Sequence, residues 1–465
     1  MLRPGDTICA PATGKGGAIS IIRVSGPDCF SICKKIFFPV DRNADVLSLK
    51  GYSIVYGEIK AGDEIIDDVL VSIFRAPHSY TGEDSVEISC HASQYIIQKI
   101  MELLINNGAT SAYPGEFTQR AFANGKMDLS QAEAVADIIS STSRAAHKIA
   151  VNQMRGGFSA EISKLRAELL HFASLIELEL DFGEEDVELA DRNDLKAIVL
   201  KVKTVADKLA SSFKTGNAIR NGIPVVIVGK PNSGKSTLLN ALLSEDRAIV
   251  SEIPGTTRDT IEDTMSIDGI MFRFIDTAGL RETTDVIESL GINRTYEKVK
   301  QAAVILLLDE ITDAPDEIND RADSIRKLID EDQRLIVIIN KIDKGSSELK
   351  ELERKIRISE SEAKIFISAK NRTGIDELKK IIVDTSIQEK LGSDDVIINN
   401  IRHFEALKNV SASLGRVIEG LDNSVPDDLI AIDIRHAMHY LGEITGEITS
   451  DEILGNIFKN FCIGK

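Results

Sequence analysis

The chain has 465 residues, which is too many for a single hydrophobic core, so its length predicts roughly two to four domains. Its composition, 43% hydrophobic and 28% charged, is typical of a soluble globular protein. A net charge of −18 argues against a nucleic-acid-binding protein that depends on overall positive charge. If RNA is a partner, it must meet a local basic patch or arrive with a second, basic protein.

The sequence predicts a cytoplasmic protein without a membrane span. It contains no apolar run of about 18 residues, and the N-terminal MLRPGDTICAPATGKGG lacks the charged-then-apolar pattern of a signal peptide. The cysteines have no metal-binding spacing, and their odd number fits a reducing compartment. They are Cys9, Cys29, Cys33, Cys90 and Cys462.

Residues 1–119 are predicted to form an α+β domain. Short β-rich runs, AISIIRVSG, DVLVSIFRA and DSVEISCHAS, accompany one helical stretch, SQYIIQKIMELLINNGA. From about residue 129 the apolar residues recur at helical spacing instead, and only Gly156–Gly157 interrupts this pattern.

An α/β domain is predicted to be inserted into a helical domain. Strands and helices alternate from IPVVIVG (223–229) to about residue 383, as in a doubly wound, mostly parallel sheet. The flanking residues are helical in character, so we expect a helical domain in two parts, 120–217 and 384–465, around an α/β domain at 218–383.

The stretch VVIVGKPNSGKSTLLNALL combines a strand, the motif G-x-x-x-x-G-K-S and a helix, as in a phosphate-binding loop. Gly229 and Gly234 permit torsions and a close phosphate approach that a Cβ would block. We expect Lys235 to bridge the β- and γ-phosphates and Ser236 to bind Mg²⁺, while backbone N–H groups face the β-phosphate. The predicted nucleotide contacts in this loop are Asn232, Ser233, Gly234, Lys235, Ser236 and Thr237.

Further elements in the expected order predict that the nucleotide is GTP. In DTAG, Asp276 is placed to reach the Mg²⁺ shell and the Gly279 N–H to contact the γ-phosphate. In NKID, Asp343 can accept hydrogen bonds from guanine N1–H and the exocyclic amine, which adenine does not offer. ISAK (367–370) offers a backbone N–H to guanine O6, and Thr257 in PGTTRD is the candidate switch threonine that binds Mg²⁺. The predicted contacts in the two base-binding elements are Asn340, Lys341, Asp343, Ser368, Ala369 and Lys370.

Leu280 stands where Ras-like GTPases carry a glutamine that orients the attacking water, and a leucine cannot do this. Loss of hydrolysis is one interpretation. In the other, a monovalent cation beside Asn232, with carbonyl oxygens from SEIPGTT, supplies the positive charge of an arginine finger. From sequence alone, the simpler interpretation of Asn232 is an amide that caps the loop.

Glu288 offers a second way to place the water, because a carboxylate in this polar stretch could act through a bridging water. The same stretch, with Glu282 and Asp285, reads equally as a solvated surface. Arg258 and Arg281 are candidate arginine fingers or ordinary surface charges.

The whole chain resembles the tRNA modification GTPase family known as MnmE or TrmE. The family-like blocks are IIRVSGP (21–27), SYTGEDSVEISCH (79–91), PGEFTQRAFANGKMDLSQAEAVADII (114–139), ELDFGEEDVE (179–188), GEITGEIT (442–449) and the ending FCIGK (461–465). The phosphate loop is general to GTPases, whereas the 114–139 block and the Cys-Ile-Gly-Lys ending are specific.

The resemblance implies a potassium-dependent GTPase whose two G domains meet across the nucleotides. It places potassium at Asn232 with carbonyls of Ser251, Ile253 and Thr256, adds Ser251 and Thr256 to the GTP site, and assigns the indirect action on water to Glu288. The N-terminal domain is implied to form a homodimer and to bind 5-formyl- or methylene-tetrahydrofolate. The folate contacts carry over to Arg23, Glu87, Lys126 and Lys465.

The resemblance also implies chemistry on tRNA. With a flavin- and NADH-using partner that resembles MnmG (GidA), in a heterotetramer, such proteins add an aminomethyl or carboxymethylaminomethyl group to C5 of the wobble uridine. Cys462 is a candidate nucleophile if a nearby cation lowers its pKa, although free cysteines are usually buried and inert. Cys90 and His91 neighbour each other on a predicted strand, so they should point to opposite faces, and we interpret Cys90 as packing.

Two departures affect the implied folate pocket. The loop ATGKGGAIS (12–20) lacks the proline that is usual in the family and is shorter, and Ala92 and Ser93 replace common glycines.

Two rival interpretations of the function remain open. One is a regulatory GTPase in ribosome assembly without tRNA chemistry of its own, and the other is a scaffold whose nucleotide state only opens and closes a dimer. The specific ending and the absence of a basic RNA-binding domain distinguish the favoured interpretation from the first.

Overall fold

The computed structural model describes residues 5–14, 16–181, 192–244, 263–275, 297–330, 332–345, 349–386, 396–423, 425–459, 461 and 464. The chain separates into two compact units, and the long second stretch of unit 2 interrupts unit 1 in sequence. Unit 1 comprises Met1–Ile139, Asn152–Lys203 and Asn409–Lys465, and unit 2 comprises Ser140–Val151 and Thr204–Lys408. The boundaries expected after residues 119, 217 and 383 remain predictions. Among the described residues, no helix combines the length and apolar character needed to cross a bilayer.

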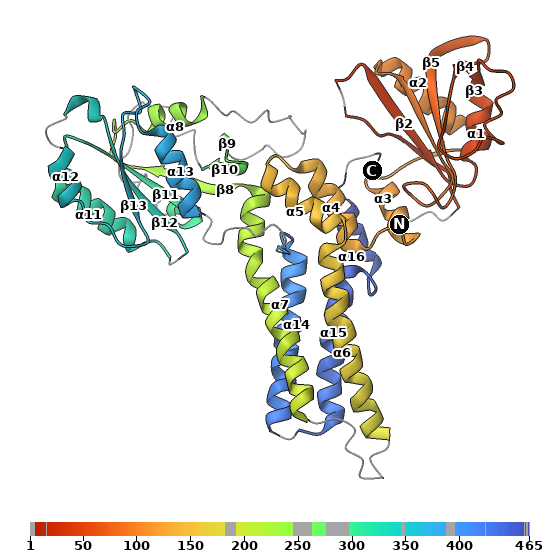
Figure 1. Ribbon diagram of the computed structural model, residues 1–465. Coiled ribbons are helices and arrows are strands. Elements are labelled where there is room, and N and C mark those ends of the chain that lie inside the picture. The colour runs from red at the N-terminus through yellow and green to blue at the C-terminus, as the bar shows by residue number, and fades with distance from the viewer. Residues whose placement is uncertain are drawn as a thin grey trace. The chain divides into compact units, whose positions relative to one another are not determined.

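The N-terminal part of unit 1 is a seven-stranded sheet in the order β3-β4-β5-β6-β2-β1-β7. Its helices α1 (Cys29–Ile36) and α2 (Gln94–Asn106) pack on one face through alternating strand residues such as Ile22, Val71 and Ile88 (Figure 1). The strands expected around residues 18–26, 68–76 and 84–93 and the following helix are confirmed. The strands are β1 (Ile8–Pro11), β2 (Ile19–Ser25), β3 (Phe37–Pro39), β4 (Ser53–Ala61), β5 (Glu64–Phe74), β6 (Ser85–His91) and β7 (Thr110–Ser111).

The helical regions follow the predicted pattern with one correction. A second break, at residues 141–143, separates α4 from α5, because the Ser143 hydroxyl accepts a hydrogen bond from Ala146 N at 3.1 Å and caps the new helix. The break at Gly156–Gly157 is confirmed, since Gly156 has φ +82°. The helices are α3 (Glu116–Ala123), α4 (Leu129–Ser140), α5 (Arg144–Met154), α6 (Gly157–Asp181), α7 (Arg192–Asn221), α14 (Ile401–Asp422), α15 (Asp427–Thr445) and α16 (Asp451–Phe458).

Unit 2 contains a six-stranded sheet in the order β13-β12-β11-β8-β10-β9, parallel except for β9. Helices α8 and α13 pack on one face and α11 and α12 on the other, as expected for a doubly wound sheet (Figure 1). The strands are β8 (Ile223–Val228), β9 (Asp263–Ile267), β10 (Ile270–Phe274), β11 (Val304–Glu310), β12 (Arg334–Asn340) and β13 (Ala363–Phe366). The helices are α8 (Lys235–Leu243), α11 (Pro315–Arg326), η1 (Ile342–Lys344), α12 (Leu349–Lys355) and α13 (Ile375–Ser386).

The segments that lead into and out of this sheet lie side by side. The rings of Phe213 on α7 and Phe404 on α14 stack at 4.8 Å, and Ile398 N donates to Ser212 Oγ at 3.1 Å. At Gly216 a Cβ would lie 2.1 Å from the Ile398 carbonyl oxygen, so only glycine permits this approach. Entry and exit points this close are what a domain insertion requires.

Candidate functional site

The phosphate loop joins the end of β8 to the start of α8, and its glycines are required by close contacts. A Cβ on Gly229 would lie 2.2 Å from the Leu308 carbonyl oxygen, and one on Gly234 would lie 2.4 Å from Asn340 Nδ2. Both glycines have positive φ, +150° and +101°. The loop therefore packs against the ends of β11 and β12. The N-terminus of α8 presents backbone N–H groups, which are suited to bind an anion.

Lys235 and Asn232 shape the loop. Lys235 Nζ donates to the carbonyl oxygens of Gly229 and Lys230 at 2.9 and 2.8 Å, and burial lowers the pKa of this lysine. Asn232 has φ +64°, in the left-handed region that asparagine tolerates better than most residues. Ser236 and Thr237 stand in the first turn of α8, where the Ser236 hydroxyl offers the oxygen ligand that Mg²⁺ prefers.

Asn340 connects the guanine motif to the phosphate loop. Its Nδ2 donates to the Ser233 carbonyl oxygen at 2.9 Å, and its Oδ1 accepts from Ala369 N at 3.0 Å. Lys341 Nζ donates to the Asn232 carbonyl oxygen at 2.7 Å. Segments around residues 232, 340 and 369, predicted from three separate motifs, thus meet at one end of the parallel sheet.

The carboxylate of Asp343 is oriented by a hydrogen bond from Ser368. It lies in η1, and its Oδ1 accepts a hydrogen bond from Ser368 Oγ at 2.6 Å, which lowers the pKa of Asp343. The carboxylate is therefore ionised at neutral pH and can accept the two N–H donors of guanine. Lys370, the last residue of ISAK, is exposed.

The switch residues of the prediction lie outside the described residues. These are Ser251, Ile253, Thr256, Thr257, Arg258, Asp276, Gly279, Leu280, Arg281, Glu282, Asp285 and Glu288.

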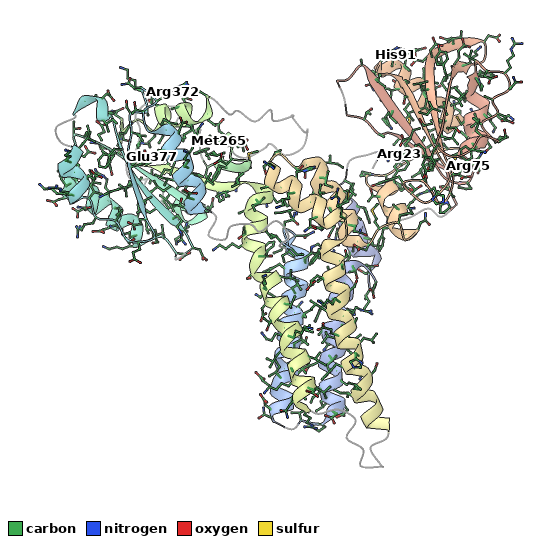
Figure 2. All side chains as sticks on the ribbon, viewed as in Figure 1. Arg23, Arg75, His91, Met265, Arg372 and Glu377 are labelled. Atoms are coloured by element: carbon green, nitrogen blue, oxygen red, sulfur yellow. The ribbon has the colours of Figure 1, made fainter. Side chains whose placement is uncertain are left out.

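Two of the predicted folate residues face each other on the N-terminal sheet. Arg23 on β2 is paired in register with Glu87 on β6, and Arg23 Nε lies 2.9 Å from Glu87 Oε1. Arg23, labelled in Figure 2, also lies over the rings of Tyr80 and Phe117, at 5.1 and 5.6 Å. Sequence reasoning missed both aromatic residues, because their positions carry no spacing signal relative to Arg23. Phe117 is buried, whereas Arg23, Glu87 and Tyr80 are partly exposed, so a charged pair and one aromatic ring reach solvent at this place on the sheet.

The remaining N-terminal candidates are less closely grouped. Lys126 Nζ donates to the Pro77 carbonyl oxygen at 2.9 Å, and no contact joins it to Arg23 or Glu87 among the described residues. The carbonyl of Gly464 accepts from Arg23 Nη1 at 3.4 Å, whereas Cys462 and Lys465 lie outside the described residues.

Cys90 is a packing residue, as predicted. It is 3% exposed, and burial raises its pKa to about 11. The neighbouring His91, labelled in Figure 2, is exposed, and its Nδ1 lies 2.7 Å from Asp67 Oδ1.

Comparison with known proteins identifies the family. Residues 7–126 match the family described as GTP-binding protein TrmE N-terminus, and residues 129–462 match the MnmE helical domain. A protein of Bacteroides thetaiotaomicron named tRNA modification GTPase MnmE is 53% identical over 464 residues, which cover 99% of each chain. Proteins of the same name from Bacteroides fragilis and Christiangramia forsetii are each 52% identical, over 99% and 100% of each chain.

The chain belongs to the MnmE family of tRNA modification GTPases. This membership confirms the predicted family and the prediction that the chain is a GTPase. The MnmE helical-domain match begins before the six-stranded sheet and ends after it, which confirms a G domain between two helical parts.

Proposed function

We propose that this chain hydrolyses GTP to drive the modification of wobble uridines in tRNA. The observation that carries the proposal is near-complete alignment, at 53% identity, with a protein named tRNA modification GTPase MnmE. Asn340 donates a hydrogen bond to the phosphate loop and accepts one from the Ala369 N–H, and these contacts support guanine-nucleotide binding independently.

In this proposal, the loop from Asn232 to Thr237 binds the phosphates of GTP through backbone N–H groups and Lys235. Asp343 and a backbone N–H of ISAK (367–370) select guanine. Ser236, with Thr257 and Asp276, would hold Mg²⁺, which when bound neutralises charge on the β- and γ-phosphates. The bonds of Lys235 to Gly229 and Lys230 support this role, since a phosphate would replace those two carbonyls as its partner.

Potassium would be held by Asn232 and by carbonyls of Ser251, Ile253 and Thr256. A cation there supplies positive charge between the phosphates, as an arginine finger does in other GTPases. Because Leu280 cannot orient water, Glu288 would do so through a bridging water when two G domains meet. The left-handed backbone at Asn232 supports the site, because it is a constrained geometry held by surrounding contacts.

The N-terminal domain would form the homodimer and bind 5-formyl- or methylene-tetrahydrofolate through Arg23, Glu87, Lys126 and Lys465. The face of the N-terminal sheet opposite α1 and α2 supports dimerisation. It exposes Phe38, Ile54, Tyr56 and Leu70 on the neighbouring strands β3, β4 and β5. These side chains share one face, and an apolar patch of this kind favours burial by another protein surface.

The carbon-transfer step would take place with an MnmG (GidA)-like flavoprotein that uses NADH, in a heterotetramer. The product would be tRNA with an aminomethyl or carboxymethylaminomethyl group at C5 of the wobble uridine, and Cys462 is the candidate nucleophile. The net charge of −18 supports a partner that provides most of the RNA-binding surface. We place these events in the cytoplasm.

Mass analysis of tRNA nucleosides from cells that lack this chain tests the proposal. We expect the C5-modified wobble uridines to disappear and to return with a plasmid copy. Unchanged nucleosides together with accumulated ribosome precursors would favour the regulatory GTPase of ribosome assembly instead.

A further inference from the structure

The acidic end of strand β11 contacts the nucleotide site from a position that belongs to none of the GTPase motifs. Glu310, the last residue of β11, lies opposite Asn340 in the register of the parallel pair. Its Oε1 lies 2.7 Å from Lys341 Nζ, and the two side chains are 14% and 24% exposed. The same Nζ donates to the Asn232 carbonyl oxygen at 2.7 Å. Lys341 therefore links Glu310 to the phosphate loop.

The backbone of Glu310 is hydrogen-bonded to Asp313 on both sides. Its backbone N–H donates to Asp313 Oδ2 at 3.1 Å, and its carbonyl oxygen accepts from Asp313 N at 3.0 Å. Asp313 is 4% exposed and also pairs with Lys230, the second residue of the phosphate loop. Two contacts thus run from this short acidic segment to the loop, one through Lys230 and one through Lys341.

The contact through Lys341 ends at a left-handed position of the loop, Asn232. Asn232 and Lys341 both have φ +64°, a region that costs free energy for residues other than glycine and persists only when neighbouring contacts enforce it. The Lys341 ammonium is the group that holds the Asn232 carbonyl. A lysine side chain is flexible, and the charge-assisted hydrogen bond to Glu310 favours the position in which Lys341 reaches the Asn232 carbonyl.

We propose that Glu310 is a positioning residue of the GTP site: through Lys341 it holds Asn232 in its left-handed conformation, and so sets how firmly the loop retains the nucleotide and the monovalent cation. The cation part rests on the proposed function, in which Asn232 is a potassium ligand. The nucleotide part rests only on the contacts of the phosphate loop.

If Glu310 acted only through its negative charge, removing it would change the nucleotide release rate in the opposite direction, which makes the proposal testable. A carboxylate near the phosphates repels them, so if charge alone mattered, removing it would slow nucleotide release. Glu310→Ala and Glu310→Gln would then act equally. If position matters, Glu310→Ala speeds release, and Glu310→Gln, which keeps an oxygen acceptor for Lys341, has a smaller effect.

The experiment measures release of N-methylanthraniloyl-GDP from the full-length protein after mixing with excess GDP. We expect release about tenfold faster in Glu310→Ala and about threefold faster in Glu310→Gln, from the loss or weakening of one charge-assisted hydrogen bond. Glu360→Ala is the matched control, since Glu360 is an exposed acid of the same unit that lies between α12 and β13, away from Asp313 and Lys341 in sequence. Its release rate should equal that of the unsubstituted protein.

Potassium titration of GTP hydrolysis gives the second measurement. We expect Glu310→Ala to need at least about threefold more potassium for half-maximal activity, with the maximal rate nearly kept, because the cation site is displaced rather than removed. If potassium does not activate the unsubstituted protein, the cation part of the proposed function fails, while the release rates still test Glu310. Equal or slower release in both Glu310 variants would overturn the proposal. If Glu310→Ala unfolds at a lower temperature than the unsubstituted protein, the release rate of the milder Glu310→Gln is compared with that of the unsubstituted protein instead.

Discussion

Replacing Asn340 with alanine tests the junction between the phosphate loop and the guanine motif. Asn340 is 2% exposed, and its amide makes two hydrogen bonds, to the Ser233 carbonyl and from the Ala369 N–H. Ser233 and Ala369 are themselves no more than 3% exposed, so water cannot readily replace the lost amide. The substitution therefore leaves one buried acceptor and one buried donor without their partner.

Each orphaned group costs about 1–3 kcal/mol, and partial relaxation brings the total to about 2–4 kcal/mol. The loss is shared between the unfolding free energy of the G domain and nucleotide affinity, since a loosened loop must be ordered on binding. If most of it falls on binding, GDP affinity drops by about 30- to 1,000-fold.

The assay is fluorescence titration with N-methylanthraniloyl-GDP, combined with thermal denaturation of the empty protein. Asn371→Ala is the control, because Asn371 is exposed and contributes a backbone N–H to Ser368 Oγ, which alanine retains. GDP affinity within about threefold of the unsubstituted protein, at unchanged melting temperature, would refute the reasoning, because it falls below the smallest expected cost of one orphaned group.

Three further predictions concern other parts of the molecule. Glu288→Ala should spare GTP binding and slow turnover, and unchanged single-turnover hydrolysis would return Glu288 to a surface role. Cys462→Ser should abolish tRNA modification and keep GTP hydrolysis, whereas normal modified-nucleoside levels would make this thiol dispensable. Burial raises the pKa of Asp309 to about 6, so the folded protein holds a proton there that the unfolded chain releases at lower pH. The unfolding free energy should therefore fall by about 2 kcal/mol relative to Asp309→Asn between about pH 4.5 and 7, measured by urea denaturation of the G-domain transition, and a pH-independent difference contradicts this.

The elements that could be predicted from the sequence are those whose signal is local. Strand β8 leads directly into the phosphate loop, β12 ends at the first residue of NKID, and glycine marks the tight turn of the loop, so β8, α8 and β12 follow from short patterns. The break before α5 was also encoded locally, in the serine run that ends at Ser143. It was missed because the apolar spacing continues across it.

Contacts between distant segments could not be derived in the same way. Tyr80 and Phe117 reach Arg23 only because the sheet and α3 bring them together. The pair of Glu310 and Lys341 depends on the register of β11 against β12, which a sequence does not specify on its own. The predicted motifs therefore gave the ligand class, while the groups that hold those motifs in place emerged from the fold.

The rate of GTP hydrolysis by the full-length protein in potassium and in sodium, at equal ionic strength, tests the central claim most directly. A cation held at Asn232 in place of the missing glutamine predicts faster hydrolysis in potassium, and loss of this difference in Asn232→Ala. Equal rates in the two salts, with normal GTP binding, would contradict the claim.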